Sequence, residues 1–104
     1  MRFKDKIVLI TGSAGGIGFK TALDFGNEGA IVAVTDIDFE MAKKLSNQII
    51  SNGGIAEPLQ LDVTNLEQTK NVFEVLNQKY GVCDIVFCNA GIREITPMLD
   101  FEFE

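Results

Sequence analysis

Four short apolar segments alternate with three segments of helical periodicity, and this alternation constrains the fold of the chain more than any other feature. The apolar segments are rich in Ile and Val and lie at Lys6–Ile10, Ala30–Thr35, Ala56–Leu61 and Asp84–Cys88. Nearly continuous apolar runs of this length are typical of parallel strands that are covered on both faces. The order therefore predicts an α/β fold, a doubly wound parallel sheet of the Rossmann type with helices on both faces.

Between these predicted strands, apolar residues recur at helical spacing. The three stripes are Phe19, Ala22, Leu23 and Gly26; Met41, Ala42, Leu45 and Ile49; and Leu66, Thr69, Phe73, Leu76 and Tyr80. A glycine follows each stripe, where a left-handed residue can end a helix; these are Gly29, Gly53 and Gly81. The sequence Thr64-Asn65-Leu66-Glu67 matches a capping box and predicts that Thr64 caps the third helix.

The strand order follows from the handedness of the connections. Right-handed crossovers predict the order 3-2-1-4, numbered along the chain, with the first two helices on one face and the third on the other. Pro58 agrees with this order, because proline in a strand is tolerated at a sheet edge and the third strand lies at one. The sheet changes direction between strands 1 and 4, and ligands of such sheets bind there, beyond the carboxyl ends of the strands.

The segment TGSAGGIG, residues 11–18, directly follows the first predicted strand and lies at this switch point. Glycines in a strand-to-helix turn let backbone N–H groups approach a pyrophosphate, and the helix N-terminus behind them favours an anion. The spacing Gly12-x-x-x-Gly16-x-Gly18 is a looser relative of the GxGxxG fingerprint. Taken alone it is as compatible with a plain turn as with a phosphate-binding loop.

An acidic residue at the end of the second predicted strand favours the phosphate-binding interpretation. Asp36 follows Gly12 at roughly the 20-residue spacing at which dinucleotide-binding folds place a carboxylate for the ribose hydroxyls. Such a carboxylate repels the 2′-phosphate of NADP, and residues 13–15 contain no basic side chain to offset it. We therefore predict NAD as the cofactor. The alternative is that Asp36 or Asp38 only caps the second helix, but Asp38 can fill that role, which leaves Asp36 available for the ribose.

Composition excludes several other classes of function. The net charge is −6 and the chain has no histidine, so a nucleic-acid partner, which requires clustered Lys and Arg, is not expected. No segment is apolar enough for a membrane span or has the pattern of a secretory signal. Cys83 and Cys88 are expected on opposite faces of the fourth strand as free thiols, which fits a cytoplasmic location. Without His or a CxxC pair, no metal site is expected.

With TGSAGGIG, Asp36, LDVT at residues 61–64 and NAGI at residues 89–92, the chain resembles the amino-terminal half of the short-chain dehydrogenase/reductase family. The resemblance extends from Phe3 to about Phe103. It implies an oxidoreductase that transfers hydride between a nicotinamide dinucleotide and an alcohol or carbonyl compound.

The resemblance also implies a set of cofactor contacts. Residues of the glycine turn are similar to those that bind the pyrophosphate and ribose, namely Gly12, Ser13, Gly16, Ile17 and Gly18. Asp36 and Ile37 resemble adenosine-side contacts, while Asp62 resembles the residue that bonds the adenine amino group, with Val63 packing on the ring. The residues that line the cofactor after the fourth strand would be Asn89, Ala90 and Gly91.

The acid–base machinery of that family has no counterpart here. The family uses a tyrosine with a lysine four positions later, assisted by a serine, in the second half of its fold. The one tyrosine of this chain is Tyr80, and Asp84 stands four positions after it. Because Tyr80 continues the third apolar stripe, we expect it to pack in the core. The expectation is a single truncated dinucleotide-binding domain, residues 1–104, that is inactive alone, with an interrupted helix entry at Met98–Glu104.

Two other functions stay open, and the truncation has a physical consequence. The chain could be a non-catalytic module that holds NAD or ADP-ribose, or a nucleotide-free scaffold or adenosyl-methionine-type domain. In a chain that ends here, the fourth strand would expose an apolar edge beside Ile85, Val86 and Phe87. An uncovered apolar edge promotes strand pairing between copies, so we expect a homo-oligomer or aggregate formed through this edge.

Overall fold

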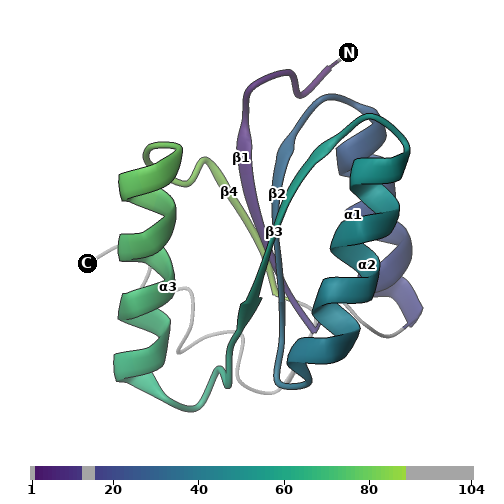
Figure 1. Ribbon diagram of the computed structural model, residues 1–104. Coiled ribbons are helices and arrows are strands. Elements are labelled where there is room, and N and C mark those ends of the chain that lie inside the picture. The colour runs from purple at the N-terminus through teal and green to yellow at the C-terminus, as the bar shows by residue number, and fades with distance from the viewer. Residues whose placement is uncertain (1, 13–15, 89–104) are drawn as a thin grey trace.

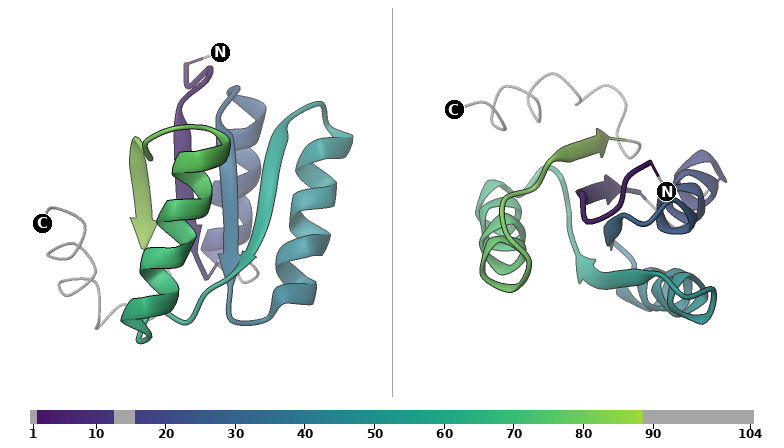
Figure 2. Two further views of the ribbon diagram at one scale, coloured as in Figure 1. Left: turned by 60° about the vertical axis from the view of Figure 1, so that its left-hand side comes forward. Right: turned by 90° about the horizontal axis from the view of Figure 1, so that it is seen from above.

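The computed structural model describes residues 2–12 and 16–88 and has three layers (Figure 1). The central layer is a parallel sheet with strand order β3-β2-β1-β4. Its strands are β1 (Ile7–Thr11), β2 (Ile31–Asp36), β3 (Ile55–Gln60) and β4 (Ile85–Cys88). The helices are α1 (Gly16–Asn27), α2 (Phe39–Ser51) and α3 (Leu66–Lys79). Helices α1 and α2 cover one face of the sheet and α3 covers the other, which confirms the expected fold and strand order (Figure 2).

The predicted strand boundaries are off by one residue. Strand β1 ends at Thr11 rather than at Ile10, because Thr11 pairs with Cys88 and its polar side chain is buried. At the other end, Asp84 does not belong to β4 but still fixes its start. The Asp84 N–H donates to the carbonyl of Ile7, and Asp84 Oδ2 accepts from the Ile7 N–H, both at 2.8 Å. Hydrophobicity alone does not show where such backbone pairing begins and ends.

The alternation of side chains along the strands divides the core into two layers. On the α1–α2 side the buried cluster includes Val8 and Ile10 of β1, Val32 and Val34 of β2, and Leu45 and Ile49 of α2. On the α3 side it consists of Leu9, Ala33, Leu61, Val72 and Leu76. Each central strand therefore contributes to both layers, as the nearly continuous apolar runs predicted.

Two members of the predicted helical stripes are not in the core. Met41 is 39% exposed and Leu66 is 56% exposed, whereas Val72, which was not in the predicted stripe, is buried. Met41 and Leu66 lie in the first turns of α2 and α3, at the carboxyl edge of the sheet, where the opposing strands end. Periodicity gives the direction of a side chain but not whether a strand lies opposite it.

The helix ends match the sequence pattern except at the start of α3. Gly29, Gly53 and Gly81 have φ values of 92°, 92° and 123°, which confirms the left-handed residues expected after each helix. The predicted cap at Thr64 is wrong, because the cap is Asn65, whose side chain accepts from the N–H of Gln68 at 2.9 Å. Asparagine is as good an N-cap as threonine, so the sequence is compatible with either Thr64 or Asn65 as the cap of α3.

Neither cysteine is in a disulfide, as expected, but the two do not lie on opposite faces. Both pack against the α3-side cluster. Cys83 precedes β4, so the alternation of side chains along a strand does not apply between it and Cys88. Among the helices of the described residues, none combines the length and apolar character that crossing a membrane requires.

Candidate functional site

The carboxyl ends of the strands bring the predicted site residues together at one edge of the sheet. Ile10 pairs with Val34, and Gly12 and Asp36 each come two residues after these paired positions of neighbouring strands. Adjacent strands are roughly 4.8 Å apart. On the other side Asp36 pairs with Gln60, and the N–H of Leu61 donates to the Asp36 carbonyl at 3.0 Å. The order across this edge is therefore Gly12, Asp36 and then Asp62.

The turn after β1 depends on glycine for its backbone conformation. Gly12 and Gly16 have φ values of 62° and 43°, in the left-handed region that side chains rarely adopt. A Cβ added at Gly16 would meet no atom within 4 Å, so the conformation rather than crowding requires glycine there. Helix α1 begins at Gly16, and its N-terminal end lies at the carboxyl edge (Figure 1). Its first N–H groups, which have no partner within the helix, suit an anionic ligand.

The next two positions of α1 have different environments. Gly18 is buried, whereas Ile17 is 69% exposed at the start of the helix. An exposed apolar side chain beside a helix N-terminus can contact the sugar of a bound nucleotide. Ser13, the remaining residue predicted in this turn, lies outside the described residues.

At the end of β2, the structure separates the roles of the two aspartates. The N-cap of α2 is Asp38, whose side chain accepts from the Met41 N–H at 3.3 Å. Asp36 is therefore not required as the cap. It is half-buried, and its Oδ1 accepts from the N–H of Asp38 at 2.9 Å, which fixes the carboxylate at the strand end. Ile37, between them, is 64% exposed, and its carbonyl accepts from Gln60 Nε2.

Asp62, after β3, is held by hydrogen bonds from the following turn. Its Oδ1 accepts from the N–H of Thr64 at 3.0 Å and from the Thr64 hydroxyl at 2.7 Å. These bonds, the one from the hydroxyl above all, lower the pKa of the Asp62 carboxyl below its ordinary value. Val63 is half-buried and packs against the α3-side cluster. The predicted adenine-side residues Asp36, Ile37, Asp62 and Val63 thus share one edge.

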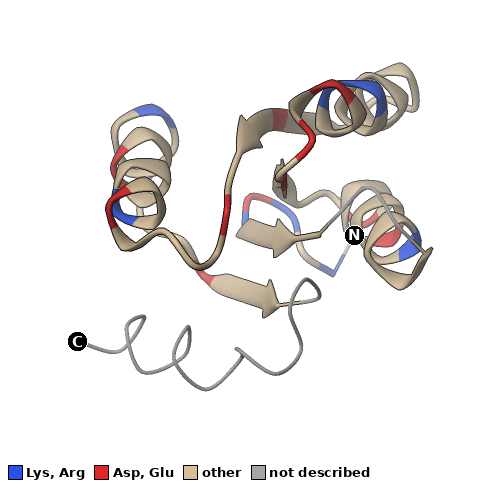
Figure 3. Ribbon diagram, turned by 90° about the horizontal axis from the view of Figure 1, so that it is seen from below, with Lys and Arg blue, Asp and Glu red and all other residues tan. Residues whose placement is uncertain are grey.

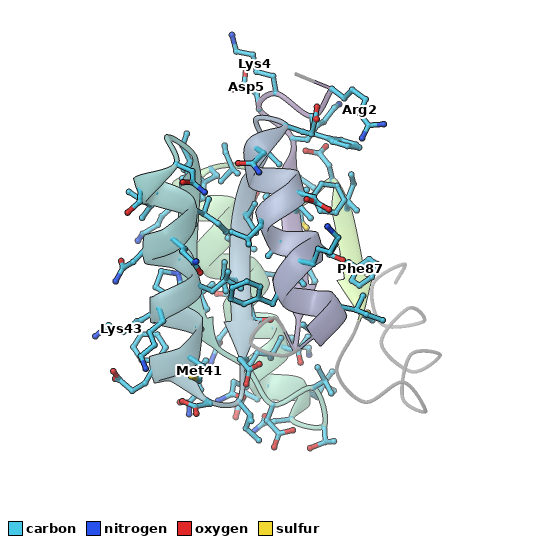
Figure 4. The ribbon with its side chains drawn as sticks, turned by 90° about the vertical axis from the view of Figure 1, so that its right-hand side faces the viewer. Arg2, Lys4, Asp5, Met41, Lys43 and Phe87 are labelled. Atoms are coloured by element: carbon cyan, nitrogen blue, oxygen red, sulfur yellow. The ribbon has the colours of Figure 1, made fainter. Side chains whose placement is uncertain are left out.

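The charge at this edge is negative. In the described segments that follow the first three strands, residues 12, 37–38 and 61–65, the ionisable side chains are all aspartates, and Asp36 ends β2 (Figure 3). Arg2 and Lys4 lie at the opposite end of the sheet (Figure 4). Lys43, on α2, has its Nζ 5.8 Å from the centre of the Phe39 ring. An acidic edge of this kind suits the hydroxyl groups of a ribose better than an added phosphate.

Tyr80 lies at the other end of the molecule, after the last turn of α3, in a structural role. It packs against the α3-side cluster, and its hydroxyl donates to Glu57 Oε1 at 3.1 Å. Lys79 Nζ lies 3.1 Å from the other oxygen of the same carboxylate. Burial, followed by the bond to Glu57, raises the pKa of Tyr80 above 10.0. A tyrosine that exchanges protons near neutral pH needs the opposite shift.

We predict that the phenol of Tyr80 titrates above pH 10.0 in the folded chain and near 10.0 after unfolding in urea. Since the folded pKa is the higher one, the stabilisation is fully present below pH 10.0 and is lost as the pH rises through the folded value. Absorbance near 295 nm reports Tyr80 alone, because the chain has one tyrosine and no tryptophan. Equal folded and unfolded titration midpoints would contradict the prediction, and Tyr80→Phe should remove the alkaline loss of stability.

The structure brings Gly12, Gly16, Ile17, Gly18, Asp36, Ile37, Asp62 and Val63 to one edge. The other predicted site residues, Ser13, Asn89, Ala90 and Gly91, lie outside the described residues. Sequence reasoning missed two residues that act on Asp62. These are Thr64, which bonds its carboxylate, and Gln68, whose side chain accepts from its N–H. The Asp-x-Thr spacing is a signal that could have indicated the first, because such turns bond side chain to backbone two residues on.

Comparison with known proteins identifies the group to which this arrangement belongs. The sequence profile of the short chain dehydrogenase family matches residues 6–104. The chain belongs to the short-chain dehydrogenase family. The recognition made from TGSAGGIG, Asp36, LDVT and NAGI is therefore confirmed.

Two relatives of similar sequence are much longer than this chain. The chain is 42% identical over 98 residues to the probable oxidoreductase EphD of Mycobacterium tuberculosis, covering 94% of this chain and 17% of that protein. It is 44% identical over 92 residues to the 3-oxoacyl-[acyl-carrier-protein] reductase FabG of Thermotoga maritima, covering 88% of this chain and 37% of that protein. The chain thus spans less than two fifths of the length of either relative.

Solved structures of several oxidoreductases superpose on the fold. The hydroxysteroid dehydrogenase of Escherichia coli aligns with a TM-score of 0.82 at 32% identity, over 86% of this chain and 38% of that chain. A putative D-mannonate oxidoreductase from Haemophilus influenza, solved with bound NAD, aligns with a TM-score of 0.77 at 31% identity, over 80% and 30%. A metagenomic short-chain oxidoreductase in complex with NADP gives 0.78 at 26% identity, over 83% and 39%. The structural relatives therefore include proteins bound to either dinucleotide.

Proposed function

We propose that this chain binds NAD(H) at the carboxyl edge of its sheet and serves as the cofactor-binding part of an oxidoreductase. The reaction would be hydride transfer between the nicotinamide and an alcohol or carbonyl compound. The catalytic acid–base groups would come from residues other than these 104. In this proposal the glycine turn, with Ser13, holds the pyrophosphate, and Asn89, Ala90 and Gly91 line the cofactor.

The observation that carries the choice of NAD is the position of Asp36. Asp36 ends the strand next to the one that leads into Gly12, and its carboxylate is fixed by the Asp38 N–H, so it is proposed to accept bonds from both hydroxyls of the adenosine ribose. The same carboxylate would face the 2′-phosphate of NADP. Two like charges about 4 Å apart cost roughly 1–4 kcal/mol, depending on screening. The described segments that follow the first three strands, residues 12, 37–38 and 61–65, contain no basic side chain to offset that cost.

Calorimetric titration of the 104-residue chain with NAD, NADP and ADP-ribose tests the proposal. We expect NAD and ADP-ribose to bind with similar affinity, because both carry the adenosine and pyrophosphate that the edge would hold. NADP should bind at least roughly tenfold more weakly, since 1.4 kcal/mol corresponds to a factor of ten. Equal or tighter binding of NADP would overturn the cofactor preference. Failure to bind any of the three would favour the nucleotide-free scaffold.

A turnover assay tests whether the pure chain carries catalytic groups of its own. The second candidate is a module that binds NAD or ADP-ribose and catalyses nothing, and the pure chain is inactive under both candidates. Tyr80, the only tyrosine in the sequence, lies at the opposite edge with a raised pKa. We therefore expect the pure chain to show no dehydrogenase turnover with any alcohol or carbonyl substrate. Turnover by the pure chain would contradict our assignment of catalysis to other residues.

We also propose that copies of the chain associate through β4. In the sheet formed by the described residues β4 is an edge strand, paired with β1. Ile85 and Phe87 are only half-buried against the α1–α2 side of the core, and Phe87 lies beside α1 in Figure 4. Exposed apolar edge strands favour pairing between chains.

Sedimentation velocity over a range of concentrations tests this association. The wild-type chain should shift from monomer to dimer or larger species as its concentration rises. Phe87→Lys should remain monomeric, because a charge on the edge opposes pairing. Far-ultraviolet circular dichroism would establish that the variant is folded. A wild-type chain that stays monomeric at millimolar concentration would contradict the prediction.

A further inference from the structure

The turn between β3 and α3 holds Asp62 from two directions. The backbone is fixed by Gln68, whose side-chain oxygen accepts from the Asp62 N–H, and by the Asn65 N–H, which donates to the Asp62 carbonyl at 2.9 Å. Among the described residues, Thr64 alone donates hydrogen bonds to the Asp62 side chain. Gln68 is in turn placed by its own N–H, which donates to the cap residue Asn65. The position of Asp62 is therefore tied to the first turn of α3.

The two bonds from Thr64 reach the same atom of the carboxylate. Both the N–H and the hydroxyl of Thr64 donate to Oδ1 of Asp62, at 3.0 and 2.7 Å. Within the part of the chain that the structure describes, no hydrogen bond reaches Oδ2. An ionised carboxylate is only an acceptor, so an occupied Oδ1 leaves Oδ2 as the atom able to accept from a ligand. Thr64 thereby selects both the rotation of the carboxylate and the oxygen that it presents.

From this geometry we propose that Thr64 is a positioning residue that directs Oδ2 of Asp62 toward the exocyclic amino group of the adenine. The inference rests on the proposed NAD function and deepens it, because it assigns discrimination of the base to a residue that need not touch the cofactor. The adenine amino group is a hydrogen-bond donor, whereas the corresponding position of hypoxanthine is a carbonyl acceptor. A correctly rotated carboxylate attracts the first and repels the second. An aspartate is ionised at neutral pH, and the hydrogen bonds from Thr64 lower the pKa of Asp62 further.

The experiment compares the binding of NAD and nicotinamide hypoxanthine dinucleotide by calorimetry. The wild-type chain should prefer NAD. Thr64→Val keeps the shape of the side chain but removes the hydroxyl, and should weaken NAD by roughly three- to tenfold while changing the hypoxanthine analogue less than about twofold. Thr64→Ser, which keeps the hydroxyl, should restore the preference.

Thr69→Val supplies a matched control. The Thr69 hydroxyl donates to the Asn65 carbonyl at 3.0 Å, so this variant loosens the first turn of α3 by the same chemical change without touching Asp62. It should leave the ratio of the two affinities unchanged. A Thr64→Val chain that retains the wild-type ratio, or a wild-type chain that binds both dinucleotides equally, would overturn the positioning role alone. A chain that binds neither would overturn the proposed function and this inference together.

Discussion

Replacing Asp36 with alanine is expected to weaken NAD binding by roughly 10- to 100-fold, while NADP binding stays unchanged or becomes stronger. The loss for NAD follows from the hydrogen bonds between a carboxylate and the ribose hydroxyls, which are worth roughly 1.5–3 kcal/mol when one partner is charged. The gain for NADP follows from removing a repulsion of similar size. The ratio of the two affinities, measured by calorimetry, is the quantity that should change most.

Two further variants separate the effect of the Asp36 charge on binding from effects on the folded structure. Asp36→Asn keeps an oxygen that can accept from the Asp38 N–H and removes the charge, so it should improve NADP binding while costing NAD less than alanine does. Asp38→Ala removes the same charge two residues away and should cost stability, about 1 kcal/mol for a lost N-cap. It should change the affinity ratio little. A similar ratio of NAD to NADP affinity in wild type and Asp36→Ala would show that Asp36 does not bind the ribose hydroxyls.

The sequence predicts the architecture because each layer of the fold depends on local patterns. The period of the apolar residues gives the strands and helices, and a single proline restricts which strand can lie at the edge. Pro58 does lie in edge strand β3, in register with Val34. The left-handed residue at the end of each helix is equally local, because glycine alone adopts that conformation without strain. These predictions required no knowledge of contacts between distant segments.

Predictions about particular side chains were less successful, for a physical reason. The cap of α3 depends on which of two adjacent residues, Thr64 or Asn65, turns toward the helix, and both are competent. The Thr64 hydroxyl instead donates a hydrogen bond to the Asp62 carboxylate. Likewise, the exposure of Leu66 depends on where the facing strand ends. Such outcomes are decided by hydrogen bonds and neighbours that exist only once the segments have met.

The candidate site could be predicted from the sequence only in part. The positions of Gly12 and Asp36 at one edge follow from strand order, so the sequence could predict them. The sequence also offered Asp38 as a residue able to cap the second helix, and the structure confirms that Asp38 is the cap. The hydrogen bonds from Thr64 to the Asp62 carboxylate were missed because they depend on the conformation of a turn.

The close approach of α1 and α2 leads to the second large effect, a loss of stability in Gly26→Ala. Gly26 is buried in α1, and a Cβ there would lie 2.8 Å from Cγ2 of Ile49, a side chain only 2% exposed that has little room to move. Helix propensity alone would favour alanine by about 0.5–1 kcal/mol, but overpacking costs about 1–3 kcal/mol. We expect a net loss of about 1–2 kcal/mol and a fall in Tm of roughly 5–10 °C.

The double variant with Ile49→Leu tests whether this contact is the cause. Leucine keeps the volume of isoleucine but has no methyl branch at Cβ, so it removes the atom that the new Cβ of residue 26 would meet. In the Ile49→Leu background, Gly26→Ala should therefore cost less than about 0.5 kcal/mol, or stabilise the chain, and the coupling between the two sites should exceed 0.5 kcal/mol. Urea unfolding of the four proteins gives this coupling. Equal costs in both backgrounds would show that the destabilisation arises elsewhere than at the α1–α2 contact.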